Sequence, residues 1–389
     1  MERAMHIRAL GTALELLCDG SVPAETVREV LESWSDARIP GVPGAERISL
    51  SVGPGRAGRA LVTVDRADQL GQVLSTVVTQ RALTRRRGTH VLLHACGLAL
   101  EDGRVIAFVG PSGMGKTTLA RTLGRRWGYV TDETVAIATS PERYGQVLPF
   151  PKPLSIVQEG APKRQVSPSA LGLAPLPDVP LRIAAIVLIE RSESPVDESG
   201  RFRPGPAEIE SERLPLAESV GLLAPHLSYL SSLEQPLSEL ARLIEGVGGV
   251  VRLRYREAAQ VATVVDELVS ADPHDRSGTG RWNAGDVPGI AAGAAHPETA
   301  ATRTWSPAPA TDWLDTGGAV VVLRGTQVHV LSGIAPPLWR RALASPRPGL
   351  PELTSAVVDA VGRPPGGGAE DRVLAALGQL VDEGVLVTG

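Results

Sequence analysis

A glycine-rich segment in the first third of the chain has the residue types needed to hold an anion. Gly110, Gly113 and Gly115 are spaced so that the backbone can turn sharply, and Lys116 and Thr117 follow directly. Glycines let backbone N–H groups point toward one centre, and the lysine adds a point charge. The segment matches the pattern G-x-x-x-x-G-K-T, a phosphate-binding P-loop.

We therefore expect a nucleoside triphosphate to bind here together with Mg²⁺, with ATP as the first candidate and GTP not excluded. The lysine of such a loop contacts the β- and γ-phosphates, and the hydroxyl after it is a magnesium ligand. The residues expected to contact the nucleotide are Gly110, Pro111, Ser112, Gly113, Met114, Gly115, Lys116, Thr117 and Thr118.

An acidic pair, Asp132 and Glu133, follows the loop by one expected helix and one expected strand. Magnesium at a P-loop needs a protein carboxylate, usually from the end of a neighbouring strand. We expect Thr117, Asp132 and Glu133 to be the metal ligands. The alternative is that the two carboxylates form a solvated turn.

The elements around the loop fit a strand, loop, helix, strand order. Apolar runs over residues 90–100 and 104–110 predict a hairpin that leads into the loop. Residues 117–127 have the composition of a helix, and residues 129–138 alternate as a strand. Residues 181–190 predict a buried central strand.

We divide the chain into four parts. Residues 1–88 predict an α+β module with a helix over residues 67–83, and residues 89–271 predict an α/β nucleotide-binding domain. Residues 272–311 are rich in Gly, Ala, Pro, Ser and Thr, which predicts a flexible linker. Residues 312–389 predict a separate unit, in which a hairpin is followed by three helices and a final strand.

Three pieces between residues 90 and 137 resemble the HPr kinase/phosphorylase family: Leu92-Leu93-His94-Ala95, the glycine-rich loop, and Gly128-Tyr129-Val130-Thr131-Asp132-Glu133. Pro149-Phe150-Pro151-Lys152-Pro153-Leu154 is a weaker likeness. The resemblance implies an HPr kinase-like P-loop fold and makes Asp132, His94 and Lys116 the catalytic candidates. Asp132 would be the general base on a serine hydroxyl. The alternative for His94 is a structural hydrogen bond at a strand start.

This sequence departs from that family in two respects. The second carboxylate is Glu133 where the family has Asp, and the signature of the phosphorylase reaction has no counterpart. We therefore expect neither dephosphorylation nor HPr itself as the substrate.

Residues 312–389 resemble the PqqD family of small winged-helix modules, on residues 328–332 leading into Leu338-Trp339 and on residues 380–386. The resemblance implies binding of leader peptides of modified natural products by strand addition at a sheet edge. A peptide or small protein is the expected partner. This part has six arginines, no lysine and eight carboxylates, a net charge of −2, so we do not expect DNA binding.

The whole-chain composition excludes several other classes. A formal net charge of −4 does not suit a general nucleic-acid binder. No apolar run reaches the roughly 20 residues of a membrane span, and Cys18 and Cys96 match no disulfide or metal spacing. We expect a cytoplasmic protein without a membrane partner. The sequence does not specify an oligomeric state.

The expected function is that of an ATP-dependent kinase that phosphorylates a Ser or Thr hydroxyl of a precursor peptide held by residues 312–389. Two alternatives remain open. The nucleotide could switch the conformation of a peptide-delivery protein without transfer, or the chain could be a kinase of a small metabolite with a C-terminal assembly unit.

Overall fold

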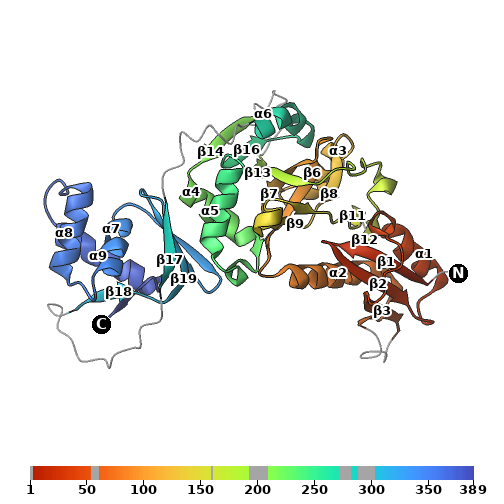
Figure 1. Ribbon diagram of the computed structural model, residues 1–389, viewed down its shortest axis with the longest axis horizontal. Helices are drawn as coiled ribbons and strands as arrows, with labels where there is room; N and C mark the ends of the chain where they lie inside the picture. Colours follow the sequence, from red (N-terminus) through yellow and green to blue (C-terminus); the bar gives the residue numbers. More distant parts are fainter. Residues whose placement is uncertain (1–2, 54–60, 159–160, 192–208, 271–281, 288–302) are drawn as a thin grey trace, which may run out of the picture. The chain divides into compact units, whose positions relative to one another are not determined.

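The computed structural model describes residues 3–53, 61–158, 161–191, 209–270, 282–287 and 303–389 (Figure 1). Contacts between Cα atoms group the chain into two compact units. Unit 1 runs to Leu214 and also takes in His226–Tyr229 and Gly246–His274. Unit 2 consists of Pro215–Pro225, Leu230–Glu245 and the chain from Asp275 onward.

Unit 1 begins with a four-stranded sheet in the order β1-β2-β3-β4. Its strands are β1 Ala4–Ala9, β2 Thr12–Cys18, β3 Glu46–Val52 and β4 Val62–Val64, and two helices, α1 Ala24–Ser33 and α2 Leu70–Arg86, accompany them (Figure 1). The helix predicted over residues 67–83 is confirmed, with a 3₁₀ turn over its first residues, Ala67–Gln69. The sequence pattern did not predict β1, β2 and α1.

The main sheet of unit 1 has six strands in the order β14-β16-β13-β7-β6-β8. The strands are β14 Glu210–Leu214, β16 Val250–Tyr255, β13 Arg182–Arg191, β7 Arg104–Val109, β6 Ala95–Ala99 and β8 Gly128–Thr131. β7, β13 and β16 are parallel, and β6 is antiparallel to both β7 and β8. β8 therefore runs in the direction of β7, so the carboxyl ends of these two strands lie at one sheet edge, beside the start of β6.

A second, small sheet has the order β10-β9-β5-β15. It contains β10 Val147–Leu148, β9 Val135–Ala138, β5 His90–Leu93 and β15 Leu227–Ser228. The strands predicted over residues 90–100 and 129–138 therefore each divide between two sheets. The chain leaves one sheet for the other at His94 and again at Asp132–Thr134, and these two crossing points are joined because Ala95 N donates to the Glu133 carbonyl at 3.2 Å.

The remaining elements of unit 1 are shorter than the sequence pattern predicts. The helix after the glycine-rich loop is α3 Lys116–Leu123, and it ends before Gly124 rather than near residue 127. Residues 258–269 form a 3₁₀ turn, Ala258–Thr263, and the helix α6 Val265–Ser270. β11 Leu154–Gln158 and β12 Ala161–Val166 form a hairpin.

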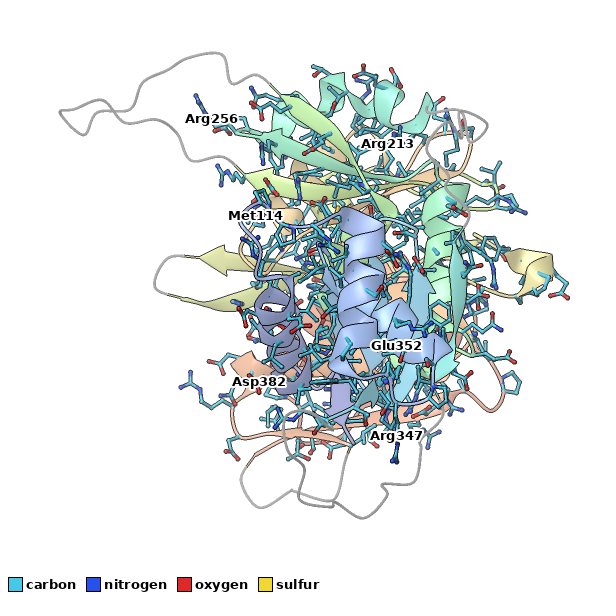
Figure 2. All side chains as sticks on the ribbon, turned by 90° about the vertical axis from the view of Figure 1, so that its left-hand side faces the viewer. Met114, Arg213, Arg256, Arg347, Glu352 and Asp382 are labelled. Atoms are coloured by element: carbon cyan, nitrogen blue, oxygen red, sulfur yellow. The ribbon has the colours of Figure 1, made fainter. Side chains whose placement is uncertain are left out.

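The C-terminal part of unit 2 contains a sheet in the order β17-β19-β20-β21. Its elements are β17 Asn283–Val287, β19 Ala310–Asp315, β20 Val320–Arg324, β21 Gln327–Leu331, α7 Ala335–Ala344, α8 Leu350–Val361 and α9 Ala369–Asp382, with β18 Trp305–Pro307 paired to β22 Leu386–Thr388. Glu352 of α8, labelled in Figure 2, forms an ion pair with Arg341 of α7. Trp339 is buried in this core.

Two short strands, β17 and β18, lie within the segment expected to be a linker. β17 pairs with β19, and β18 pairs with the last strand of the chain. Low apolar content does not prevent strand pairing, because backbone hydrogen bonds to an existing sheet need no side chain. Residues 272–281 and 288–302 of the expected linker lie outside the described residues.

The helices α4 Leu216–Leu223 and α5 Pro236–Gly246 belong almost wholly to unit 2, although the sequence order placed them in the nucleotide-binding domain. Asp312 Oδ2 accepts a hydrogen bond from Leu237 N at 2.8 Å, which caps the first turn of α5. A Cβ at Gly221 of α4 would lie 2.6 Å from Val330 of β21. Among the described residues, no helix is both long and apolar enough to cross a lipid bilayer.

Candidate nucleotide-binding site

The glycine-rich loop connects β7 to α3, as the P-loop pattern predicts. Gly113 and Gly115 have φ angles of +86° and +93°, a region that residues with a side chain rarely adopt. At Gly110 a Cβ would lie 2.8 Å from Ile189 of β13, so only glycine fits beside that strand. Three of the nine loop residues are therefore positions where the backbone requires glycine. Residues Pro111 to Gly113 are exposed to solvent.

Lys116 lies at the start of α3 and is 8% exposed. Its Nζ donates to the carbonyl oxygens of Gly110 at 2.5 Å and Pro111 at 3.1 Å, so the ammonium lies within the curve of the loop. Burial lowers its pKa, while the charges of Glu133, Cys96 and Asp132 act in the opposite direction. The neutral carbonyls are partners that an anion could replace with a stronger interaction.

Asp132 follows β8 and meets the loop at the shared sheet edge. Thr117 Oγ1 donates to Asp132 Oδ2 at 3.1 Å, and Tyr129 donates its hydroxyl to Asp132 Oδ1 at 3.0 Å. The carboxylate is buried, with a side chain 6% exposed. Thr131 fixes the turn that follows, because its Oγ1 accepts from Glu133 N at 3.0 Å. The sheet thus brings Thr117 and Asp132 together, as the sequence predicts.

Glu133 and His94 form the more exposed part of the site. His94 Nδ1 lies 3.5 Å from Glu133 Oε1, and the two side chains are 40% and 35% exposed. His94 N donates to the His226 carbonyl at 2.7 Å. The structure therefore places His94 beside the acidic pair and also gives its backbone the structural hydrogen bond that was the alternative interpretation.

Two residues at the site were not among the sequence-based candidates. Lys152 Nζ lies 3.4 Å from Asp132 Oδ1 and 3.6 Å from Glu133 Oε2, with its side chain 5% exposed. The second is His226. Its pKa is lowered, first by burial and then by the nearby charges of Lys116 and His94. Lysine is rare in this chain, so Lys152 carried a compositional signal, whereas nothing local distinguished His226.

The residues present fit a nucleotide with Mg²⁺. The loop supplies backbone N–H groups at a helix start, and Lys116 supplies a cation. Thr117 and Asp132 supply two oxygen atoms 3.1 Å apart, the ligand type that Mg²⁺ prefers. Among the described residues, no group of three or more His, Cys, Asp or Glu side chains could hold a metal ion.

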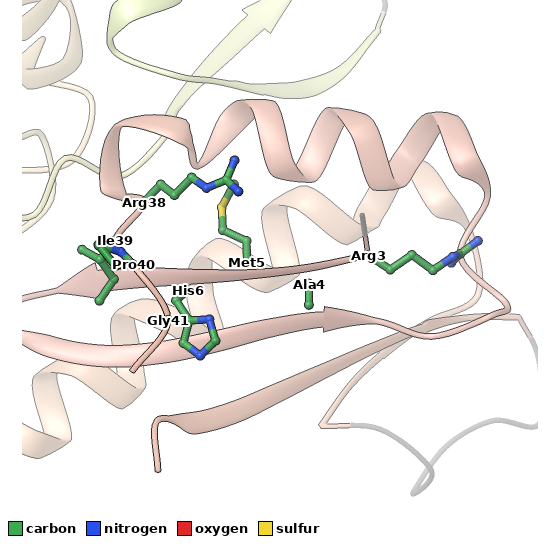
Figure 3. A pocket seen from close by; sticks show the side chains of 8 residues that line it. All are labelled: Arg3, Ala4, Met5, His6, Arg38, Ile39, Pro40 and Gly41. Atoms are coloured by element: carbon green, nitrogen blue, oxygen red, sulfur yellow. The ribbon is translucent and has the colours of Figure 1, made fainter. Parts of the chain in front are cut away.

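Other hollows lie in the N-terminal part of unit 1. A groove of about 680 Å³ is lined by Arg3, His6 and Arg38 of the N-terminal module (Figure 3). Arg3 already donates to the carbonyl oxygens of Asp19 and Val22.

Comparison with known sequences gives a short shared segment. No protein-family model matches the chain. The zinc import ATP-binding protein ZnuC of Alkalilimnicola ehrlichii is 42% identical over 57 residues, 15% of this chain and 22% of that protein. The aliphatic sulfonates import ATP-binding protein SsuB 2 of Frankia alni is 50% identical over 46 residues, 12% and 19% of the two chains.

The hemin import ATP-binding protein HmuV of Bradyrhizobium diazoefficiens is 42% identical over 50 residues. The chain thus spans about a fifth of the length of these curated relatives. The shared part is a short segment like those of P-loop ATPases, and it extends to no other part of the chain.

Among solved structures, the Hpr(Ser) kinase/phosphatase from Coxiella burnetii matches with 13% identity. The match covers 46% of this chain and 93% of that one, with a TM-score of 0.21. A score this low supports no conclusion about the fold. The mixed α/β architecture rests on the strands and helices described above.

Proposed function

We propose that the chain is an ATP-dependent phosphotransferase that phosphorylates a Ser or Thr hydroxyl of a precursor peptide. The proposal rests on one observation. The P-loop and Asp132, with Glu133 and His94 beside it, lie at the same edge of the sheet. Thr117 and Asp132 are in direct contact at 3.1 Å, and Glu133 and His94 lie next to them on the more exposed side. Phosphoryl transfer needs a metal ligand and a proton acceptor beside the nucleotide, and these side chains could supply both.

The loop amides and Lys116 would hold the triphosphate. Lys116 would exchange its present carbonyl partners for the β- and γ-phosphate oxygens, a charge-assisted and stronger interaction. Phosphoryl transfer is catalysed mostly by positioning and by stabilising charge, so a buried cation at the loop supplies much of what the reaction needs.

Thr117 and Asp132 would hold Mg²⁺, and Glu133 is a candidate third ligand. When bound, the ion neutralises charge that develops on the phosphate oxygens. On the side of the acceptor, Asp132 or His94 would accept the proton of the attacking hydroxyl. Of these two, His94 is the more exposed, at 40% against 6% for the side chain of Asp132.

The peptide is assigned to unit 2 on the resemblance of residues 312–389 to PqqD-like modules. Two observations support it: the strands β19, β20 and β21 are followed by three helices, and Val330 on β21 is 41% exposed. A strand added at a sheet edge would gain backbone hydrogen bonds, and exposed apolar side chains would give it selectivity.

A second candidate function is a nucleotide-switched binding protein. It is favoured by the path of the chain through residues 215–245. The helices α4 and α5 belong to unit 2, while His226–Tyr229 between them belong to unit 1 and include the carbonyl that accepts from His94 N. A change at the nucleotide site would therefore pass along the covalent chain into unit 2.

The test uses the full chain with Mg²⁺, γ-labelled ATP and serine-containing leader-core peptides. Label in the peptide that is lost in Lys116→Ala and in Asp132→Asn would support the kinase with these roles. Free serine serves as the small-metabolite control.

Three other results would count against the peptide kinase. Label in free serine but not in peptide would favour the metabolite kinase. ATP binding without any label would favour the switched binding protein. Label that persists in Lys116→Ala would show that the P-loop does not carry the reaction.

A further inference from the structure

Two of the three lysines in the chain lie at the candidate site, although only one belongs to the P-loop. Lys116 is 8% and Lys152 is 4% exposed, whereas Lys163 lies on the surface. All other basic side chains counted with them are arginines. An ammonium is a compact point charge, while the planar guanidinium group needs more room. The chain therefore has lysine, with its compact ammonium group, at the positions where the positive charge of the side chain is enclosed by protein.

The ammonium of Lys152 lies between the two carboxylates of the acidic pair. Its Nζ is 3.4 Å from Asp132 Oδ1 and 3.6 Å from Glu133 Oε2, and it donates to the Pro153 carbonyl at 3.2 Å. The two carboxylates are therefore ion-pair partners of the ammonium, and its hydrogen bond goes to the backbone of Pro153. Lys152 is thus the counter-ion that the two neighbouring acids share.

The backbone around Lys152 is fixed to the strand that precedes Asp132. Phe150, which is fully buried, donates its N–H to the Val130 carbonyl at 3.1 Å, and Lys152 N donates to the Phe150 carbonyl at 2.8 Å. Pro151 and Pro153 restrict the backbone on both sides of the lysine. The position of the ammonium is therefore set by the fold and does not depend on a bound substrate.

The same arrangement gives the two oxygens of Asp132 different surroundings. Oδ1 accepts from the Tyr129 hydroxyl and faces the Lys152 ammonium, whereas Oδ2 accepts from Thr117 of the loop. Only Oδ2 therefore meets a group that belongs to the P-loop.

We propose that Lys152 is a positioning residue that confines the divalent cation to the Oδ2 side of Asp132, next to Thr117, and excludes it from Glu133. A dication between the two acids would lie beside the ammonium, and like charges repel strongly where water is largely excluded. The site then takes one protein-bound divalent cation, and Glu133 remains outside its ligand shell. This inference rests on the proposed function, because it refines the metal site of that reaction.

The first test counts Mn²⁺ bound per chain by electron paramagnetic resonance, with a non-hydrolysable ATP analogue present. The wild-type chain is expected to bind one ion. Lys152→Met is expected to bind a second, which the further change Glu133→Gln removes. A folded Lys152→Met chain that still binds one ion overturns the proposal.

A second measurement leaves Lys152 in place, so it holds even if the lysine variants fail to fold. Glu133→Gln should change the Mn²⁺ affinity by less than about twofold, whereas Asp132→Asn should weaken it by at least about tenfold. A tenfold loss in Glu133→Gln overturns the proposal. Both titrations are repeated with Mn²⁺ alone, so that the metal affinities are measured independently of the nucleotide. A chain that does not bind the ATP analogue would contradict the proposed function, whatever the Mn²⁺ affinities are.

Discussion

Two buried aspartates, one in each unit, have opposite kinds of partner. Asp132 in unit 1 is surrounded by side chains: the hydroxyls of Thr117 and Tyr129 and the ammonium of Lys152. Asp312 in unit 2 is 4% exposed and accepts from backbone N–H groups, of Leu237 at 2.8 Å and of Trp313 at 2.9 Å.

The difference separates a group that can act from a group that holds the fold. Backbone amides at the start of α5 have no other partner once Asp312 is removed, so Asp312 serves as a helix cap. The hydroxyl of Thr117 can turn toward a ligand, so Asp132 can exchange what its Oδ2 binds. Burial alone would have ranked the two aspartates as equal, whereas the type of partner distinguishes them.

The largest expected effect concerns the exchange of each aspartate for asparagine. Asp132→Asn should lower phosphate transfer at least about a hundredfold at saturating ATP, because a neutral amide neither balances Lys152 nor supplies a charged metal ligand. Asp312→Asn should leave transfer within about twofold, since Asp312 binds backbone N–H groups of unit 2, and an amide oxygen can still accept the bond from Leu237 N. Equal losses in the two variants would contradict the distinction. Steady-state transfer of γ-labelled phosphate measures both.

A smaller effect is expected on stability. Asp312→Ala should lower the free energy of unfolding by about 2 kcal/mol, because the N–H of Leu237 is left buried without its acceptor. Burial raises the pKa of Asp312 above its usual range, so the neutral Asp312→Asn should cost less than the alanine variant. Denaturant titration at pH 7 measures the free energy of unfolding of both variants. If Asp312→Ala is at least as stable as Asp312→Asn, the capping role of Asp312 is refuted.

The smallest effect is expected at a third aspartate, which is more exposed. Arg340 donates to Asp315 Oδ2 at 2.6 Å and to Oδ1 at 2.7 Å, and this guanidinium group lowers the pKa of the carboxyl. Because Arg340 is 37% exposed, solvent screening limits the pair, and Asp315→Asn should cost about 0.5 to 1 kcal/mol at pH 7.

The pH dependence of that cost has a definite sign. A carboxyl with a lowered folded-state pKa contributes stability above its unfolded value of about 3.9, and the contribution is lost as the pH falls through the folded-state value. The unfolding curves of wild type and Asp315→Asn should therefore converge in acid. A difference that stays constant down to about pH 3 would mean that the ion pair is not its source.

Much of the candidate site could be predicted from the sequence because it is local. The P-loop is one continuous segment whose glycines carry their own backbone signal, and Asp132 follows it by one helix and one strand. Lys152 and His226 could not be assigned in the same way, because they reach the site from separate loops whose position depends on the pairing of β9 and β10 and of β5 and β15.

The helices α7, α8 and α9 were also predicted closely, since each has a continuous apolar period. The grouping of α4 and α5 with the C-terminal sheet was not. An apolar helix face shows that a helix packs against something, and the pattern along the chain does not say against which sheet. The strands predicted through His94 and Asp132 divided for a related reason, because a crossing between sheets leaves the apolar pattern of a strand unchanged.

The interleaved course of residues 215–245 has a practical consequence for dissecting the protein. A cut near residue 271 or 311 would remove the sheet of unit 2 and leave α4 and α5 attached to unit 1. Leu237 N of α5 would then lose its acceptor Asp312, and α4 would lose its contacts with β20 and β21. Such a truncated chain would be prone to aggregate, and its loss of activity would say nothing about a peptide. Point substitutions in the full-length chain are the informative way to separate the two units.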